Sequence, residues 1–141
     1  MSEEIPIVVE EEKKKPQKEF RAIMNIYTSF NNTIVHITDV SVKTISKVGG
    51  GMVTKHSRLK ANPTVAMFIA KRAAEQAREV GVNTLYVRIR AQTGSPSTGP
   101  GAHAVVKSVS KENFKVLSIV DITRIPRGGP KVGGGRRGRR V

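Results

Sequence analysis

A glycine-rich segment followed by three cations is the first stretch whose residues could do chemistry. It runs from Val48 to Lys60 and reads VGGGMVTKHSRLK. Glycines let a ligand approach the backbone amides, and lysine or arginine neutralises phosphate. The spacing matches neither a phosphate-binding G-x-x-x-x-G-K-[ST] loop nor a dinucleotide fingerprint, because no helix opens directly after the glycines. We predict a phosphate-contacting loop, with an ordinary turn as the alternative. Its candidate residues are Gly49, Gly50, Gly51, Lys55, Arg58 and Lys60.

A second glycine-containing turn, STGPG at 97–101, opens what we expect to be a helix. The backbone amides at Gly99 and Gly101 could cap an anion there, although a purely structural turn explains the same residues. Both glycine segments follow predicted strands and lead toward helices. Loops of this kind gather on one side of an α/β sheet, so we expect the two segments to lie together.

The C-terminal stretch from Arg124 to Val141 reads RIPRGGPKVGGGRRGRRV and contains no acid. Such a segment repels itself and stays extended until a polyanion neutralises it, and its glycines allow close approach to RNA. We interpret it as a nucleic-acid-binding tail; a solvated disordered terminus is the alternative. Its cations are Arg124, Arg127, Lys131, Arg136, Arg137, Arg139 and Arg140.

Catalytic and metal chemistry find little support in the sequence. The only carboxylate pair that we consider for a two-metal nuclease is Asp39 with Asp121, and such a site usually needs further converging acids. The histidines at positions 36, 56 and 103 lack metal-ligand spacing, and there is no cysteine. We therefore predict no catalytic residue, no metal, no cofactor and no small-molecule substrate.

Charge indicates a nucleic-acid partner. The formal net charge is +14, and residues 1–19 hold six glutamates against four lysines, so the rest carries +16. That imbalance suits phosphate binding with release of counterions. No apolar run approaches the roughly 20 residues of a membrane span and no signal peptide is evident, so we expect a cytoplasmic protein with no membrane partner. Aromatic residues make up only 4% of the chain, which favours backbone and shape contacts to folded RNA over base stacking.

Hydrophobic periodicity divides the chain into a disordered acidic arm at 1–19, a folded body at 20–123 and the basic tail at 124–141. Strands are expected at 20–28, 32–40, 43–48, 84–90 and 114–122. Helices are expected at 63–80 and from residue 102 onward. We predict a three-layer α/β fold with a mixed sheet, an antiparallel meander followed by βαβαβ, and two packed helices.

The helix at 63–80 carries the clearest local signals. Asn62 is a suitable N-cap, Pro63 suits the first helical position, and Gly81 stands where a left-handed C-cap belongs. A stripe of small apolar residues predicts the face that packs on the sheet. Its members are Val65, Ala66, Ile69, Ala70, Ala73, Ala77 and Val80.

Several of these segments, taken in order, resemble a known family. FNNTIVHITDV, GGGMVTKHSR, NPTVAMFIAKRAAEQA, GPGAHAV and GRRGRRV are similar to the universal small-subunit ribosomal protein eleven family, in its archaeal and eukaryotic branch. The resemblance covers about residues 20–141. It implies a three-layer α/β protein that binds ribosomal RNA on the platform of the small subunit, beside other ribosomal proteins, with its tail near the messenger RNA exit path.

Carried over by position, the resemblance implies RNA contacts at Asn31 and Asn32, at the Gly49–Lys60 segment, at Gly99–Gly101 and in the tail. Our predicted set also includes Lys47, Arg88 and Arg90 on strands. The chain departs from the family pattern in two places. Arg127, Gly128 and Gly129 follow Pro126 where a Pro-His-Asn-Gly turn is usual, and Ala102 with His103 follow the Gly-Pro-Gly where many members have a charged residue.

The sequence also allows two other hypotheses for the function. One is a nucleic-acid enzyme on a ribonuclease-H-like sheet, with Asp39 and Asp121 as metal ligands. The other is a DNA-compacting protein or general nucleic-acid chaperone, for which the arginine and glycine tail would suffice.

Overall fold

The computed structural model describes residues 18–93, 98–130, 135, 136 and 138. Five strands, two long helices and two short helical turns form the body. In chain order they are β1 (Arg21–Thr28), β2 (Thr33–Asp39), β3 (Thr44–Gly49), α1 (Gly50–Val53), η1 (Ser57–Leu59), α2 (Pro63–Val80), β4 (Thr84–Ala91), α3 (Gly101–Lys111) and β5 (Lys115–Asp121).

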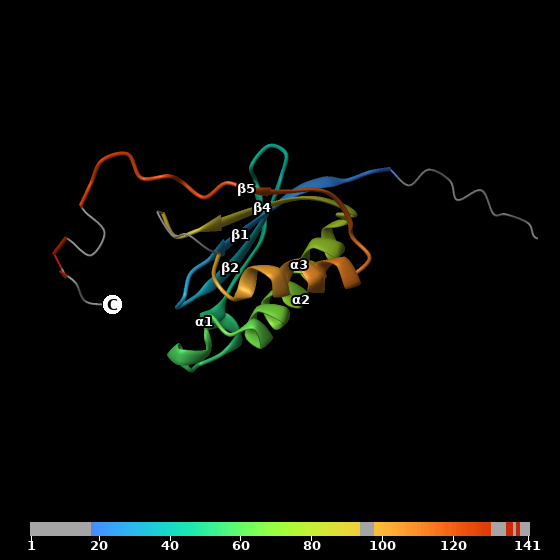
Figure 1. The fold of residues 1–141 in the computed structure, drawn as a ribbon. Helices are drawn as coiled ribbons and strands as arrows, with labels where there is room; N and C mark the ends of the chain where they lie inside the picture. Colours follow the sequence, from blue (N-terminus) through green and yellow to red (C-terminus); the bar gives the residue numbers. More distant parts are fainter. Residues whose placement is uncertain (1–17, 94–97, 131–134, 137, 139–141) are drawn as a thin grey trace, which may run out of the picture.

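The strands form one mixed sheet in the order β3-β2-β1-β4-β5. The meander β1-β2-β3 is antiparallel, whereas β4 pairs in parallel with both β1 and β5. Figure 1 shows the sheet passing above α2 and α3. Parallel neighbours need crossover connections, and α2 and α3 supply them. The mixed α/β fold predicted from the sequence is confirmed.

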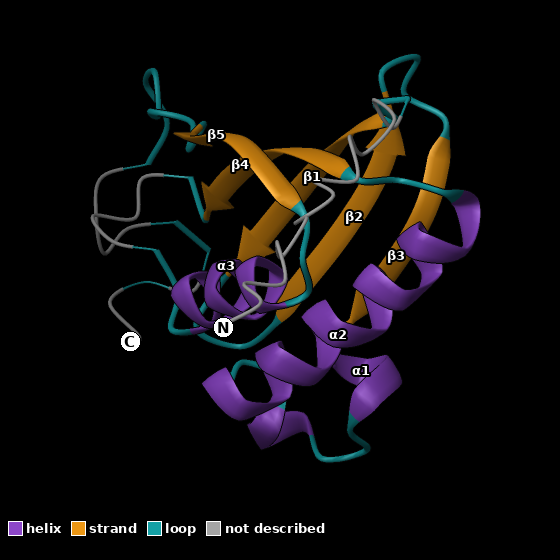
Figure 2. Ribbon diagram, turned by 90° about the vertical axis from the view of Figure 1, so that its right-hand side faces the viewer, coloured by secondary structure: helices purple, strands orange, loops and turns teal. Residues whose placement is uncertain are grey.

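The helices α2 and α3 lie side by side on one face of the sheet, as Figure 2 shows. The described residues therefore form two layers, a sheet and a helical layer, and supply no third layer of the kind that the sequence predicted. The opposite face of the sheet is left uncovered by helices. We call it the open face, and its side chains include Ile23, Asn25, Tyr27, Ile34, His36, Lys47, Tyr86, Arg88 and Arg90.

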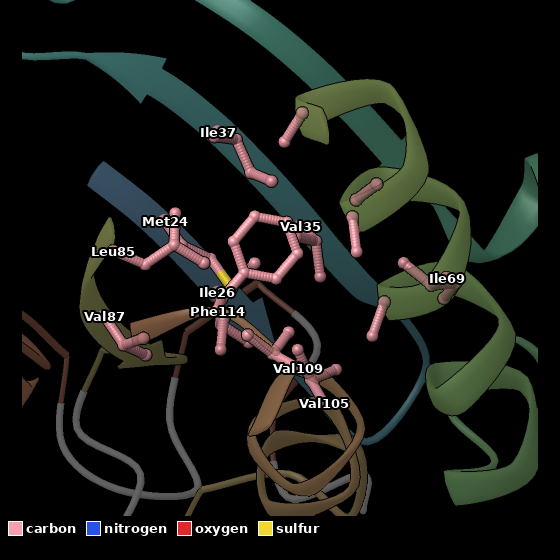
Figure 3. Close-up of a cluster of buried hydrophobic side chains, with 14 of the residues drawn as sticks. Met24, Ile26, Val35, Ile37, Ile69, Leu85, Val87, Val105, Val109 and Phe114 are labelled. Atoms are coloured by element: carbon pink, nitrogen blue, oxygen red, sulfur yellow. The ribbon is translucent and has the colours of Figure 1, made fainter. Parts of the chain in front are cut away.

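The hydrophobic core fills the space between the sheet and the two helices (Figure 3). Along β1, Ala22, Met24 and Ile26 are buried while their neighbours are only partly covered, which is the period-two pattern of a strand with one packed face. Ile69 from α2 closes the core from the helical side, with no exposed surface. The same alternation leaves the strand cations Lys47, Arg88 and Arg90 on the open face.

The capping signals of α2 are confirmed. The Oδ1 of Asn62 accepts a 2.9 Å hydrogen bond from the amide of Thr64, and Gly81 has a left-handed φ of 102°. One member of the predicted stripe is wrong, because Val80 is 54% exposed. Val80 is the last residue of α2, where the packing of the helix on the sheet ends. Ala74, which the stripe omitted, is fully buried.

Candidate nucleic-acid interface

The predicted RNA-contacting segments converge on one end of the sheet. Thr28, the last residue of β1, pairs with Thr33 at the start of β2 and with Ala91 at the end of β4. Gly49, the last residue of β3, pairs with Ile34 on β2. The hairpin turn at 29–32, the segment at 50–62 and the segment leading to α3 therefore share this end. We call it the loop end, and both glycine segments lie there together, as predicted.

The hairpin turn at the loop end is held by its own side chains. The amide of Ser29 donates to the carbonyl oxygen of Asn32 at 2.9 Å, and the amide of Asn32 donates to the Ser29 hydroxyl at 3.0 Å. Asn32 is half-buried and its Oδ1 accepts from the amide of Thr33 at 2.8 Å. Asn31 is exposed. Of the two predicted asparagines, Asn31 is thus available for RNA, and Asn32 also serves the turn.

The glycine-rich segment is not the open loop that the sequence predicted. Its first residues form the helical turn α1, in which the amide of Thr54 donates to the carbonyl oxygen of Gly50 at 3.0 Å, and residues 57–59 form η1. Gly50 is buried, and a Cβ there would lie 2.7 Å from Oδ1 of Asn32 and 2.8 Å from the carbonyl oxygen of Lys60. A side chain at this position would overlap the protein itself. Packing within the protein requires a glycine here, and its predicted contact with RNA stays a prediction.

Gly99 and Gly101 are also explained by contacts within the protein. The buried amide of Gly99 donates to the Thr28 hydroxyl at 3.1 Å, and a Cβ on Gly99 would lie 2.7 Å from the carbonyl oxygen of Ser29. Gly101 is buried against Thr33, whose hydroxyl a Cβ on Gly101 would overlap. These glycines let the α3 segment dock on the hairpin turn. The predicted RNA contacts of Gly99 and Gly101 stay predictions.

The cations that follow the glycines face outward. Lys55 and Arg58 are exposed and Lys60 is half-buried. The two glycines that flank Gly50 have more space than it does: Gly49 makes only an ordinary 3.7 Å contact, and Gly51 is exposed. The exposed residue Arg72 on α2 donates from Nη1 to the carbonyl oxygen of Met52 at 3.2 Å. Arg72 therefore ties α1 to α2 and positions the cationic segment.

The strand cations of the predicted set lie on the open face. In the sheet register Lys47 stands beside His36, His36 beside Asn25, and Asn25 beside Arg88, so four polar residues form one row across four strands. His36 is half-buried, and its Nε2 lies 2.9 Å from the Thr44 hydroxyl. The row borders a hollow of about 380 Å³. Polar groups in this arrangement can bind phosphates and base edges.

Arg90 lies one row nearer the loop end than Arg88. Its guanidinium carbon lies 5.7 Å from the centroid of the Tyr27 ring, which is a cation–π distance. Its Nε is buried and has no hydrogen-bond partner among the described residues. The alternation of residues at 84–90 predicts that Arg90 lies on one face of its strand, but no local pattern indicates Tyr27 as its neighbour, because the two residues come from strands far apart in the chain.

The tail leaves the body at the loop end from a fixed point. The Thr123 hydroxyl accepts from the amide of Ala91 at 3.0 Å and donates to Oδ1 of Asp121 at 2.6 Å. This hydroxyl, together with the Thr123 amide, holds the pKa of Asp121 below its usual value. Beyond it, Arg124, Arg127 and Arg136 are exposed, and Gly128 and Gly129 have positive φ angles. The other predicted tail cations, Lys131, Arg137, Arg139 and Arg140, lie outside the described residues.

The nuclease hypothesis is wrong, because its two carboxylates lie at opposite ends of the sheet. Asp39 pairs with Ala22 at the start of β1, whereas Asp121 pairs with Ile89 near the end of β4. The two residues are offset by four positions along the strands, which is about 13 Å, and by three strand spacings across the sheet, which is about 14 Å. The Ser41 hydroxyl is the main cause of the lowered pKa of Asp39. Within residues 18–93 and 98–130, no three histidines or acids form a group that could hold a metal.

A comparison with known protein families agrees with the fold and with the residues gathered here. None of the described helices is long and apolar enough to cross a membrane. The family model for ribosomal protein S11 matches residues 22–137, which is most of the chain and includes β1 from its second residue, the other four strands, both long helices and most of the tail. The chain therefore belongs to the ribosomal protein S11 family.

Proposed function

We propose that this protein binds small-subunit ribosomal RNA through the loop end, the open face and the basic tail together. Membership of the S11 family makes it a structural ribosomal protein of the small subunit that binds ribosomal RNA. The proposal adds which surface of the chain binds the RNA. The proposed contact residues on this surface are Asn31, Asn32, Lys47, Gly49, Gly50, Gly51, Lys55, Arg58, Lys60, Arg88, Arg90, Gly99, Gly101 and the basic residues of the tail.

The main support for the proposal is that several cations lie at the loop end while most described acids lie toward the opposite end. The cations Lys55, Arg58 and Arg124 occupy the loop end, where the only acid among the described residues is Asp121. The other described acids lie toward the opposite end, where the amide of Asn83 donates to the carbonyl oxygen of Phe20 and both long helices finish. They are Glu19, Asp39, Glu75, Glu79 and Glu112. A protein polarised in this way presents one end to a polyanion.

Two of the five acids toward the far end form ion pairs. Glu19 lies 3.1 Å from Arg21 and 3.4 Å from Lys115, and their hydrogen bonds and charges lower the pKa of Glu19. Glu112 lies 3.2 Å from Arg78. Local cations therefore balance Glu19 and Glu112, whereas no acid other than Asp121 offsets the cations of the loop end among the described residues.

Finer features of the function rest on the resemblance of the sequence motifs. We propose a place on the small-subunit platform, with the tail near the messenger RNA exit path and with neighbouring ribosomal proteins in contact. The segments FNNTIVHITDV, GPGAHAV and GRRGRRV support an archaeal or eukaryotic type of S11 protein in the cytoplasm. The division into an arm at 1–19, a body at 20–123 and a tail at 124–141 belongs to the same proposal.

Binding to a platform fragment of small-subunit ribosomal RNA, measured over a range of salt concentrations, tests the proposal. The double variant Lys55→Ala/Arg58→Ala should bind more weakly, and the slope of log K against log salt should shrink by about 1.4 to 1.8, because each neutralised phosphate contributes about 0.7 to 0.9. The control Lys71→Ala/Lys107→Ala removes the same charge from the helical layer and should leave the slope unchanged. Equal effects of the two variants would refute the surface assignment.

The same measurement separates ribosomal RNA binding from general nucleic-acid compaction. A general chaperone would bind random duplex DNA as tightly as the RNA fragment, whereas the proposed function requires a clear preference for the RNA fragment at moderate salt. Co-sedimentation with small subunits at that salt is the matching cellular measurement.

A further inference from the structure

We propose that the open face is a stacking surface for unpaired RNA, with Tyr27 and Tyr86 each receiving one base. This inference rests on the proposed function and specifies the kind of RNA element and the mode of contact. The chain contains two tyrosines, and both point onto the open face from the adjacent strands β1 and β4. Aromatic side chains on the central strands of an uncovered sheet bind bases in the same way in RNA-recognition modules.

The spacing of the two rings selects unpaired RNA. Tyr27 is in register with Arg90, and Tyr86 is in register with Ile23, four residues earlier along the same strand pair. The two stacking positions are therefore about 13 Å apart along the sheet. Successive bases within a duplex strand are only about 3.4 Å apart. Bases that reach both tyrosines must be splayed out from an unpaired strand.

Arg90 prepares the first stacking position. Its guanidinium lies 5.7 Å from the centroid of the Tyr27 ring, while its buried Nε has no partner among the described residues. The hollow of about 380 Å³ beside this pair is also lined by Asn25, His36 and Lys47. The Asn25 amide offers both a donor and an acceptor to a base edge, and Lys47 offers charge to a phosphate.

The second stacking position lies around Tyr86. Its hydroxyl accepts a 3.3 Å hydrogen bond from Nη1 of Arg21, which fixes the outer edge of the ring. A hollow of about 400 Å³ surrounds it, with Ile23 and Val120 supplying apolar walls. Arg88 lines both hollows. Arg88 is exposed between the two base positions, where the phosphates of a bound strand would pass.

Charge on this face favours RNA over a protein segment as the occupant. Lys47, Arg88 and Arg90 supply three cations, and no acid among the described residues lines either hollow. Phosphates complement the cations, and bases complement the apolar walls and rings. The low aromatic content of the chain argued against stacking, but composition cannot reveal that both tyrosines share one surface.

Fluorine NMR of the full chain labelled with 3-fluorotyrosine tests the inference, because the protein should give two resonances and both come from the open face. The probes are an unstructured oligouridine strand and an RNA hairpin of equal length with a fully paired stem and a minimal loop. We expect both resonances to shift with oligouridine and much less with the hairpin. Static resonances with oligouridine, or shifts with the hairpin alone, would overturn the proposal.

Affinity measurements on variants give a second, independent test. Tyr27→Leu and Tyr86→Leu should each weaken oligouridine binding roughly 5-fold to 150-fold, since stacking contributes about 1 to 3 kcal/mol per base. Tyr27→Phe and Tyr86→Phe should retain binding, which separates stacking from loss of the hydroxyl. Phe68→Leu is the matched control, because Phe68 is an aromatic residue 56% exposed on α2.

The outcomes separate this inference from the proposed function. Leucine variants that bind oligouridine like the wild type overturn the stacking surface, even if the salt-dependent binding of the folded RNA fragment persists. Displacement of oligouridine by an acidic peptide that shifts both resonances equally well would identify a protein partner and would also overturn it. Loss of fragment binding in the wild type would instead refute the proposed function.

Discussion

Gly50 packs directly against the side-chain amide of Asn32, so closely that a Cβ on Gly50 would lie 2.7 Å from Oδ1 of Asn32. That oxygen already accepts a hydrogen bond from the amide of Thr33. The glycine segment and the hairpin turn are therefore one packed unit at the loop end. Two residues that the sequence marks for RNA contact are held in place by each other.

Replacing Gly50 with alanine should destabilise the protein by about 1 to 3 kcal/mol, the usual cost of overpacking a closed site. The backbone oxygen of Lys60, 2.8 Å from the added Cβ, cannot move aside cheaply. The neighbouring Gly51→Ala is the matched control: its Cβ would approach only the end of the Lys60 side chain, at 3.6 Å. Urea unfolding of both variants checks the prediction, which fails if the two variants are equally stable.

Removing the Thr123 hydroxyl should raise the pKa of Asp121. Because the folded-state pKa is lowered, the bond stabilises the fold above the unfolded pKa, and this stabilisation is lost as pH falls through the folded value. Thr123→Val should therefore reduce stability at neutral pH and have a smaller effect in acid, where only the bond from Ala91 to Thr123 is lost. Carboxyl titration by NMR measures the pKa directly. Thr123→Ser should restore the lowered value, and a pKa unchanged in Thr123→Val would contradict this explanation.

Breaking the contact between Arg72 and Met52 should loosen α1 without unfolding the protein. Arg72 is exposed, so Arg72→Ala should lower global stability by less than about 1 kcal/mol. Amide hydrogen exchange should nevertheless become faster at Thr54, whose amide closes the α1 turn. Lys71→Ala is the control, since Lys71 lies beside Arg72 and no hydrogen bond joins it to α1 among the described residues. Unchanged exchange in Arg72→Ala would remove Arg72 from the support of α1.

Neutralising the last four arginines of the tail should reduce the salt dependence of RNA binding. Replacing Arg136, Arg137, Arg139 and Arg140 with glutamine should lower the slope of log K against log salt by about 3, if each contacts one phosphate. Replacing Lys13, Lys14 and Lys15 in the acidic arm is the comparison and should leave the slope unchanged. A tail variant with the wild-type slope would exclude the tail from the RNA contact.

The sequence predicted the five strands and the two long helices because each has a local signal, whereas it did not predict the short turns α1 and η1. Asn62, Pro63 and Gly81 mark the ends of α2 through capping chemistry, and the alternation in β1 and β4 marks the packed face. Contacts between distant residues carry no such signal. The packing task of Gly99 against Ser29 and the pairing of Arg90 with Tyr27 arise only when the hairpin, α3 and β4 come together.

The candidate site was predicted as a set of residues and not as a surface. Loop composition identified Lys55, Arg58 and the glycines, and strand alternation identified Arg88 and Arg90. The sheet register, which sequence alone does not provide, aligns Lys47 with Arg88 across four strands. The register also separates Asp39 from Asp121, the two acids that the nuclease hypothesis took as metal ligands.

Amide chemical-shift mapping of the 15.4 kDa chain with a platform fragment of small-subunit ribosomal RNA tests the central claim most directly. We predict that the shifts cluster at Asn31, Lys55 and Arg58 on the loop end and at Arg88 and Arg90 on the open face. The outer surface of α2, with its acids at positions 75 and 79, should stay unperturbed. Chemical-shift changes concentrated on α2 and α3, without changes at the loop end and the open face, would contradict the proposed RNA-binding surface.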